Sequence, residues 1–513
     1  MTPATAAAPA TDLPDRLEGY GTLHPFRDAP GPARPRASGT GAGGKLLASL
    51  EAAVEACGLR DGATVSFHHH LRNGDGVLNA VLDVLALRGL RGLHVAATSI
   101  FPVHAPLIEH IRRGTVARLS ANFVSGPVGH AISQGLVPEP VVLRTHGGRA
   151  RALQTGELAV DAAFVAAPAA DPLGNLSGRS GRSAFGTLGY PLCDVGFARH
   201  VVAVTDGLVP YPAPWIDIPQ DAVDFVVEVP SIGDAAGIVS GTLRPASDPI
   251  SLAIAEATAG AIEASGLLTD GFSFQTGAGG ISLATAAQVR ARMAARGVTG
   301  SFASGGITGF HVEMLRAGLL RALLDVQCFD LRAVESYRSD PRHQMISASV
   351  YANPAIGGAV VDQLDAVVLG AAEVDLDFNV NVTTKADGVV MGGSGGHADT
   401  AAGARLALIT TRLSAAGHPK IVDRVGTRTT PGSTIDAVVT EVGIAVNPRR
   451  ADLAERLGDA GLPVVAIDDL FRASQSQATQ PPPVRPAGRV VAVSEYRDGS
   501  VTDVVRQVGG ADA

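Results

Sequence analysis

Two glycine-rich stretches in the middle of the chain hold the residue types best suited to chemistry. The first is Gln275-Thr276-Gly277-Ala278-Gly279-Gly280, and the second is Gly305-Gly306-Ile307-Thr308-Gly309, with Glu313 shortly after it. Each follows an apolar run and precedes a helical pattern, which predicts strand, turn and helix. Glycine lets the backbone approach a ligand closely, and the N–H groups at a helix start attract anions. Such turns suit a phosphate, a carboxylate or a developing oxyanion.

A single glycine run is more simply a tight strand-to-helix connection that binds nothing. Two such runs with a carboxylate beside the second favour a binding site, and Glu313 is the first candidate for a catalytic carboxylate. The alternative for Glu313 is a solvated glutamate that the helix dipole stabilises.

Another candidate site is the segment 68–73, which contains three histidines and an arginine. It follows a predicted strand, Thr64-Val65-Ser66-Phe67. Open α/β sheets bind ligands in loops at the carboxyl ends of their strands. Three consecutive histidines suggest a metal, but neighbours in an extended chain point to opposite sides, and no set of Cys, Asp or Glu with ligand spacing lies nearby. We therefore expect no metal and predict an anionic substrate site in which arginine binds carboxylate. Its candidate residues are His68, His69, His70, Arg72 and Asn73.

A third glycine loop ends in Gly395 and Gly396 and leads through His397 into a predicted helix. We predict that these three residues also bind substrate, although His397 has an alternative as a hydrogen-bonded core histidine. The segment from Glu373 to Val382 alternates polar and apolar residues, which predicts a half-exposed strand. Its carboxylates, Glu373 and Asp375, are then expected to be solvated.

Composition limits the class of protein. A chain of 513 residues is long enough for two or more domains. Its net charge of -8 gives no general attraction to nucleic acid or anionic membranes. The three cysteines lack Cys-x-x-Cys spacing, which argues against a disulfide scaffold or a zinc site. We find no signal peptide and no membrane-spanning apolar run, and therefore expect a cytoplasmic protein.

Alternating strand and helix patterns predict an α/β fold with parallel sheets. Asp248-Pro249 is a typical helix start and marks a domain boundary. A helix is expected over 45–57, and Asp498-Gly499 is the predicted turn of a C-terminal hairpin. The predicted organisation is a disordered or arm-like segment over 1–45, α/β domains over 46–247 and 248–474, and a Pro-rich linker with the hairpin over 475–513.

These motifs together resemble the acyl-CoA transferases and, among them, the citrate lyase alpha chains. The resemblance extends from about Leu46 to the C-terminus. It rests on segments that occur in the family's order, which are 66–75, the first glycine stretch, 309–314, 324–327, 394–400 and 438–445.

The resemblance implies two similar open-sheet α/β domains of the CoA-transferase type that face each other across a cleft. It also implies the exchange of acetyl for citrate on the thioester of an acyl carrier protein, which yields citryl carrier protein and acetate. Glu313 would then match the catalytic glutamate of related CoA-transferases, although citrate lyase alpha chains are thought to transfer directly in a ternary complex, where Glu313 would orient substrate. The residues expected at the thioester are Gln275, Gly277, Gly279, Gly280, Gly305 and Gly306.

No tightly bound cofactor is implied, because the CoA-type thioester on the carrier, or free acetyl-CoA, is a substrate. The implied partners are the acyl carrier (gamma) and lyase (beta) subunits, with a homo-oligomer inside the complex. Carrier proteins are usually acidic, so a local basic patch is a candidate docking surface. Its residues are Arg144, Arg149, Arg151, Arg179 and Arg182. The alternatives are a freestanding acetyl-CoA:carboxylate CoA-transferase, a non-catalytic citrate-binding scaffold and, by analogy of fold alone, a sugar-phosphate isomerase.

Overall fold

The computed structural model describes residues 16–17, 21–22, 44–239, 246–277, 279–480 and 485–509. Most of the predicted N-terminal arm, part of the predicted linker and Ala278 of the first glycine stretch therefore lie outside the described residues. The chain divides into two units, Met1–Arg36 and Ala37–Ala513. In the first, β1 (Arg16–Leu17) pairs with β2 (Gly21–Thr22) in an antiparallel arrangement. All that follows concerns the second unit.

The first large sheet has ten strands in the order β28-β27-β7-β6-β5-β4-β8-β11-β12-β3. Every pairing in it is parallel except that of β27 with β28. The strands are β3 (Leu46–Leu47), β4 (Thr64–Phe67), β5 (Leu93–Ala97), β6 (Val116–Ala121), β7 (Val141–Arg144), β8 (Ala162–Ala167), β11 (His200–Thr205), β12 (Phe225–Glu228), β27 (Val490–Glu495) and β28 (Val501–Arg506).

The strand order reverses beside β4. The chain adds β5, β6 and β7 on one side of β4, and then returns to add β8, β11 and β12 on the other. In open α/β sheets, ligands bind where the strand order reverses, outside the carboxyl ends of the strands. The loop that carries the three histidines leaves β4 at this point.

The second sheet has nine strands in the order β16-β15-β14-β13-β17-β20-β24-β25-β26. Its pairings are parallel except that of β24 with β25. The strands are β13 (Phe274–Thr276), β14 (Gly300–Ile307), β15 (Leu320–Cys328), β16 (His343–Met345), β17 (Ala366–Gly370), β20 (Leu406–Thr410), β24 (Ala437–Val439), β25 (Ile444–Val446) and β26 (Val464–Val465). The order reverses beside β13, whose end begins the first glycine stretch. Both sheets thus repeat one winding scheme, and the predicted α/β fold is confirmed.

Smaller strand pairs complete the sheets. A three-stranded sheet has the order β19-β18-β23, and β9 pairs with β10 and β21 with β22. These strands are β9 (Ala169–Ala170), β10 (Leu176–Ser177), β18 (Glu373–Asp375), β19 (Val380–Asn381), β21 (Ser414–Ala415), β22 (His418–Pro419) and β23 (Ile421–Val422).

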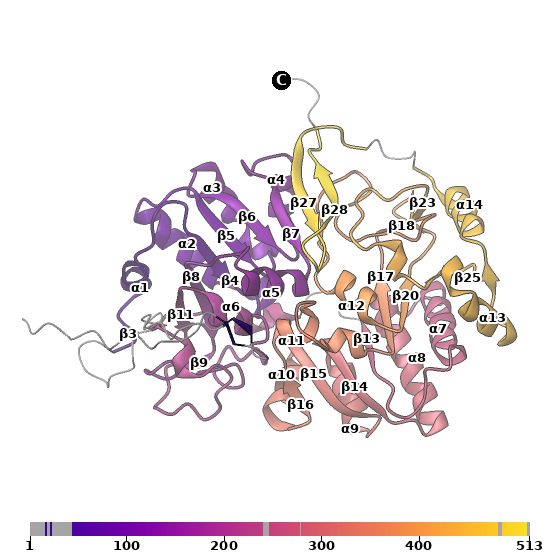
Figure 1. Cartoon of the computed structure of the whole chain (residues 1–513), viewed down its shortest axis with the longest axis horizontal. Helices are drawn as coiled ribbons and strands as arrows, with labels where there is room; N and C mark the ends of the chain where they lie inside the picture. Colours follow the sequence, from indigo (N-terminus) through magenta and orange to yellow (C-terminus); the bar gives the residue numbers. More distant parts are fainter. Residues whose placement is uncertain are drawn as a thin grey trace, which may run out of the picture. The chain divides into compact units, whose positions relative to one another are not determined.

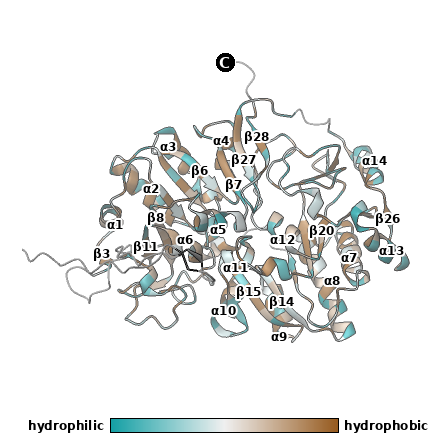
Figure 2. Ribbon diagram, in the orientation of Figure 1, coloured by the Kyte–Doolittle hydropathy of each residue, from teal (hydrophilic) through white to brown (hydrophobic). Residues whose placement is uncertain are grey.

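The helices alternate with the strands, as the parallel pairings require. They are α1 (Leu50–Ala56), α2 (Val77–Leu87), α3 (Leu107–Arg112), α4 (Pro127–Ser133), α5 (His146–Thr155), α6 (Pro191–Phe197), α7 (Pro249–Ala264), α8 (Gly280–Arg296), α9 (Gly309–Arg316), α10 (Leu331–Ser339), α11 (Ala348–Ala352), α12 (His397–Gly403), α13 (Ala451–Asp459) and α14 (Ile467–Gln477). As predicted, α7 begins at Asp248-Pro249, where the Asp248 side chain accepts a hydrogen bond from Ser251 N. Apolar residues gather on the strands, whereas α10 and α13 are largely hydrophilic (Figure 2). Among the described residues, no helix combines the length and the apolar character needed to cross a membrane.

Two local predictions are wrong. Residues 45–49 are not helical, because Leu46 and Leu47 pair with β12 as β3, and α1 begins after the cap Ser49. The segment 373–382 is not one half-exposed strand, because it folds back between β18 and β19 with Phe378 at a φ of 64°. Glu373 and Asp375 are buried there, contrary to the expectation that they are solvated.

The predicted C-terminal hairpin forms, and it belongs to the first sheet. β27 pairs with β7 in parallel, with Ala492 opposite Val141. In Figure 1 the yellow hairpin accordingly lies beside the purple strands, although the chain reaches it only after completing the second sheet. One continuous core contains buried residues from both sheets, including Val65 and Ala303.

Candidate active site

A cavity of about 1050 Å³ lies where the carboxyl ends of the two large sheets meet. The first sheet contributes the loop residues that follow four adjacent strands, namely His69 and Arg72 after β4, Ser99 after β5, Phe123 after β6 and His146 after β7. The second sheet contributes the ends of β13, β14, β15 and β17, which supply Gln275, Gly277, Gly305, Gly306, Gln327 and Gly370. Loops at both reversal points therefore line one cavity.

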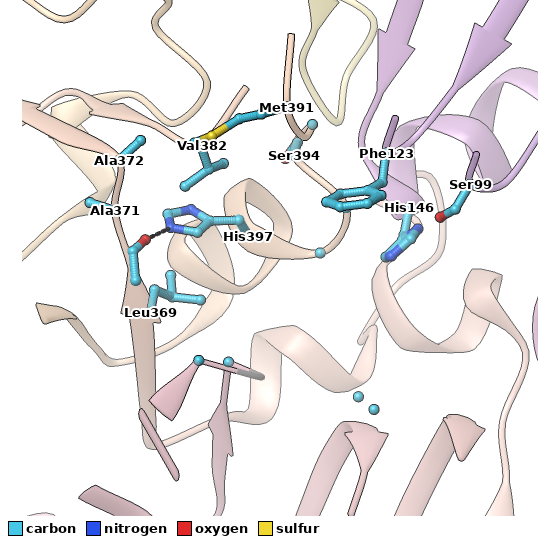
Figure 3. Close-up of a pocket in the computed structure, with 18 of the residues that line it drawn as sticks. Ser99, Phe123, His146, Leu369, Ala371, Ala372, Val382, Met391, Ser394 and His397 are labelled. Atoms are coloured by element: carbon cyan, nitrogen blue, oxygen red, sulfur yellow. Dashed lines mark hydrogen bonds between the residues drawn. The ribbon is translucent and has the colours of Figure 1, made fainter. Parts of the chain in front are cut away.

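The cavity has two ends of different character (Figure 3). At the end that we call the polar end, Ser99 and His146 lie together with His69, Arg72 and Tyr190. At the other, which we call the apolar end, the wall consists of Leu369, Ala371, Ala372, Val382 and Met391. Ser394 lies between the two ends in Figure 3.

The three consecutive histidines have three different environments. Only His69 lines the cavity, and its Nδ1 lies 2.5 Å from Thr98 Oγ1. His68 points instead toward Asp194, at 3.6 Å, and His70 stacks on Phe185 with ring centroids 5.0 Å apart. Burial lowers the pKa of His68 to about 4 and holds the pKa values of His69 and His70 well below their ordinary value. All three rings are therefore neutral at physiological pH.

Arg72 is held in an unusual backbone conformation at the cavity. Its φ of 52° lies in the left-handed region that non-glycine residues seldom adopt, which is typical of functional positions. The guanidinium carbon lies 4.5 Å from the centroid of the Phe329 ring and 5.3 Å from that of Phe101. Burial lowers the pKa of Arg72 to about 10, so the side chain remains charged at neutral pH. Asn73 does not line the cavity, because its Oδ1 accepts a hydrogen bond from Val103 N.

Two of the predicted glycines, Gly305 and Gly396, leave space for a pair of side chains at the cavity. A Cβ on Gly305 would lie 2.7 Å from the Gln275 side chain, and one on Gly396 would lie 2.6 Å from the Tyr351 hydroxyl. Gln275 Nε2 and that hydroxyl are 2.8 Å apart, so the two glycines make room for this pair. All four residues line the cavity, and so do Gly306 and Gly395.

The first glycine stretch does not offer all its backbone N–H groups to the cavity. Its contribution is the N-terminus of a helix. Gly277 lines the cavity, but its N–H donates to Val368 O and is not available to a ligand. Gly279 also lines the cavity and is the N-cap of α8, a helix of 17 residues, whereas Gly280 is not among the lining residues. The N-terminus of α8 therefore lies at the cavity wall, where it favours negative charge.

His397 lines the cavity and is also fixed by hydrogen bonds. Its Nδ1 lies 2.8 Å from Thr430 Oγ1 and its Nε2 2.9 Å from Gly370 O. Figure 3 shows the second of these contacts, between the ring and the backbone oxygen. Burial lowers its pKa to about 4. With both ring nitrogens engaged, His397 shapes the wall of the cavity and has no free nitrogen to act as a base.

Glu313 does not lie in the cavity. Its carboxylate pairs with Arg332 at 2.6 Å and Arg290 at 3.2 Å, and its side chain is 38% exposed. The hydrogen bond from Arg332 lowers its pKa. It lies one turn into α9 and is absent from the lining residues, so its position does not support the predicted catalytic role. The carboxylates that do line the cavity are Glu373 and Asp387.

Gln327 joins the two sheets at the cavity. Its Nε2 donates to His69 O at 3.0 Å, and its backbone N–H donates to Asp325 Oδ1 at 2.8 Å. The other oxygen of Asp325 lies 2.9 Å from His343 Nε2 and accepts a hydrogen bond from Cys328 Sγ at 3.0 Å. These three buried side chains are close enough to hold a metal ion. Burial and the neighbouring Asp325 raise the pKa of the Cys328 thiol. The three side chains are hydrogen-bonded through Asp325, which also accepts the backbone N–H of Gln327 and so helps to orient it.

The basic patch proposed from the sequence is not a free surface. Each of its arginines forms an ion pair, and Arg149 is buried against Asp194 at 2.6 Å. The other pairs are Arg144 with Glu495, Arg151 with Glu157, Arg179 with Asp217 and Arg182 with Asp206. Carrier docking through this patch is therefore not supported.

Residues 43–508 match the family model for the citrate lyase alpha subunit. The chain belongs to the citrate lyase alpha subunit family. It is 47% identical to the citrate lyase alpha chain of Escherichia coli strain K12 over 464 residues, which are 90% of this chain and 91% of that protein. It is 45% identical to the alpha chain of Klebsiella pneumoniae over 91% of this chain and 92% of that protein.

A solved structure supports membership in the citrate lyase alpha subunit family. The chain is similar to a Streptococcus mutans protein described as the alpha subunit of citrate lyase in complex with citrate. The TM-score is 0.90 at 44% identity, over 97% of this chain and 99% of that one. A malonate decarboxylase hetero-tetramer from Pseudomonas contains a chain with a TM-score of 0.63 at 17% identity, over 85% of this chain and 94% of that one. At that identity the likeness shows the fold alone.

Several lining residues were not predicted from the sequence. They are Ser99, Phe123, His146, Tyr190, Tyr351, Lys385 and Lys420. His146 has a signal that would have identified it, since it lies two residues after the end of β7 and begins α5. Tyr190 reaches the cavity as the N-cap of α6, and Tyr351 from within α11.

Proposed function

We propose that this chain exchanges acetyl for citrate on the thioester of an acyl carrier protein, releasing acetate and forming citryl carrier protein. The observation that carries the proposal is the single cavity at both reversal points, with a polar end suited to a carboxylic acid and an apolar end suited to a thioester arm.

Citrate is placed at the polar end in this proposal. Arg72 provides a fixed positive charge there, and its planar fork of donors matches a carboxylate. His69 and His146 are neutral because burial lowers their pKa values, so they act as hydrogen-bonding groups and not as counter-charges. Citrate has three carboxylates and only one arginine binds it in this proposal. One carboxylate can therefore remain free to react with the thioester.

The carrier's arm enters along the apolar end. The wall of Leu369, Ala371, Ala372, Val382 and Met391 can pack against the methyl and methylene groups of an uncharged arm, whose burial the hydrophobic effect favours. The thioester then lies near Gln275 and the N-terminus of α8. Negative charge that develops on the thioester oxygen is favoured at a helix N-terminus.

The chemistry needs no residue that bonds covalently to substrate. A citrate carboxylate attacks the acetyl carbonyl, the C–S bond breaks, and the carrier thiolate leaves a mixed acetic–citric anhydride. The thiolate then attacks the citryl carbonyl of that anhydride, and acetate leaves. Charge and atoms balance without a proton or a cofactor, and the reaction does not require Glu313, which lies outside the cavity.

We further propose that the chain works in a complex with an acyl carrier subunit and a lyase subunit. In this proposal the citryl thioester is cleaved at a separate active site on the lyase subunit. The CoA-type thioester is then a substrate borne by the carrier, and no tightly bound cofactor is part of the proposal.

Acetate release from acetyl carrier protein in the presence of citrate tests the proposal. Acetyl-CoA serves as a parallel donor, and release from it alone would identify a freestanding CoA-transferase. Binding of citrate without acetate release from either donor would indicate a non-catalytic scaffold.

A further inference from the structure

Lysine is scarce in this chain, and its placement is informative. The sequence contains only three lysines among 41 basic residues, and two of them, Lys385 and Lys420, line the cavity. The third, Lys45, has a structural role, since its Nζ donates to the backbone oxygens of Gln220 and Val223. Most other basic side chains are arginines, many of which form ion pairs. The two cavity lysines differ from these arginines in residue type and in forming no ion pair within the described residues.

Lys420 is fixed at the apolar end by the backbone. Its carbonyl oxygen accepts a hydrogen bond from Val374 N at 2.8 Å, which places it beside Glu373 and Ala372 of the cavity wall. The residue directly precedes β23, which pairs with β18. In the described part of the chain its ammonium group forms no ion pair and no hydrogen bond, although Glu373 and Glu441 lie near enough to raise its pKa and Arg412 near enough to lower it.

Lys385 reaches the same end from another segment. It opens a turn in which its N–H donates to Val389 O at 2.9 Å, and it lies between Val382 and Met391 of the apolar wall. Its side chain is exposed, and it has no ion pair within the described part of the chain. One partly buried and one exposed ammonium group therefore lie at this end of the cavity. Two carboxylates line it as well: Glu373, which accepts hydrogen bonds from Asn381 Nδ2 and Gly426 N, and the exposed Asp387.

We infer that Lys420 and Lys385 form a phosphate subsite that binds the phosphorylated end of the thioester arm. This inference rests on the proposed function and adds a subsite to it. The arm has amide groups but no charge along its length and is anionic at its phosphate, so the two ammonium groups at this end of the cavity supply the counter-charge that the phosphate needs. A lysine is a compact point charge that suits a phosphate, whereas the bidentate arginine at the polar end suits a carboxylate.

Binding of small fragments to the full chain distinguishes the proposed phosphate subsite from the citrate site. Calorimetry would use phosphopantetheine, pantetheine and citrate as separate probes. The expected result is that phosphopantetheine binds about tenfold or more tightly than pantetheine, that Lys420→Met and Lys385→Met each shrink this ratio, and that neither changes citrate affinity. Lys420→Arg should retain most of the preference, because it keeps the charge.

Arg472→Met is the matched control. Arg472 is 70% exposed on α14, pairs with Asp469 of the same helix and lies outside the cavity, so the change removes one positive charge without touching the subsite. Equal binding of the two fragments by the unaltered chain, or weaker citrate binding by Lys420→Met, would overturn the phosphate assignment. Acetate release by the unaltered chain is measured separately, so failure of the subsite and failure of the exchange reaction are distinguishable.

Discussion

His146 Nε2 lies 2.9 Å from the phenol oxygen of Tyr190, and their ring centroids are 4.7 Å apart. The two residues come from α5 and α6 and meet at the polar end of the cavity. Burial, and then the nearby Arg149, lower the pKa of His146 to about 3, while burial raises the pKa of Tyr190 well above its ordinary value. Both partners are thus neutral, and their contact fixes the orientation of the imidazole toward the cavity.

Tyr190→Phe should lower kcat/KM for citrate about tenfold, because it releases the imidazole of His146 from its fixed orientation. The lost hydrogen bond should cost ~1 kcal/mol of unfolding free energy. Steady-state kinetics and denaturant unfolding measure the two effects. Tyr211→Phe is the control, since Tyr211 is exposed and outside the cavity. Equal kinetic losses in the two variants would contradict a specific role for Tyr190.

Arg72→Lys should raise the KM for citrate about tenfold or more and leave the KM for the thioester donor unchanged. Lysine keeps the charge but loses the fork of donors and the planar contact with Phe329. Initial rates at varied citrate and varied donor separate the two constants. If only the donor constant changed, the polar end would not be the citrate site.

Glu313→Gln should retain activity within about twofold. Its ion pairs with Arg290 and Arg332 are partly exposed, so their loss should cost less than ~1 kcal/mol of stability. Activity and thermal unfolding of this variant and of Arg332→Gln give the comparison. A folded Glu313→Gln protein with a loss of about a hundredfold or more would restore the catalytic assignment that the sequence suggests.

Binding of the phosphorylated arm should weaken as the pH rises through about 8. Burial lowers the pKa of Lys420 to about 8, with Arg412 acting in the same direction and Glu373 and Glu441 opposing it. The ammonium form binds anions, so the phosphopantetheine preference should decline from about pH 7 upward, where the phosphate is doubly charged, with its midpoint near pH 8. Lys420→Arg should keep the preference to higher pH. The same decline in both proteins would mean that another group causes it.

The sequence predicted the α/β class, most strands and the ends of strands that carry the site, because glycine turns and apolar runs are local signals. It placed Arg72, His69, Gln275 and Gly396 at a binding site, and all four line the cavity. It could not separate His69 from its neighbours, since which face of an extended chain is buried depends on tertiary packing.

Other features depend on contacts between distant segments. The alternating pattern around Glu373 and Asp375 predicted a solvated strand. Glu373 is instead buried, where it accepts hydrogen bonds from Asn381 Nδ2, after the chain folds back, and from Gly426 N, 53 residues away. The C-terminal hairpin was predicted as a local unit, but its pairing with β7 joins residues far apart in the chain. Such long-range partners leave no local periodicity to detect.

The most direct test of the account is acetate release by the purified chain from acetyl carrier protein, measured with and without citrate and compared with Arg72→Met. The account predicts citrate-dependent acetate release that the substitution reduces at least about tenfold, while the variant still binds the carrier. Acetate release that does not require citrate, or that Arg72→Met leaves unchanged, would contradict it.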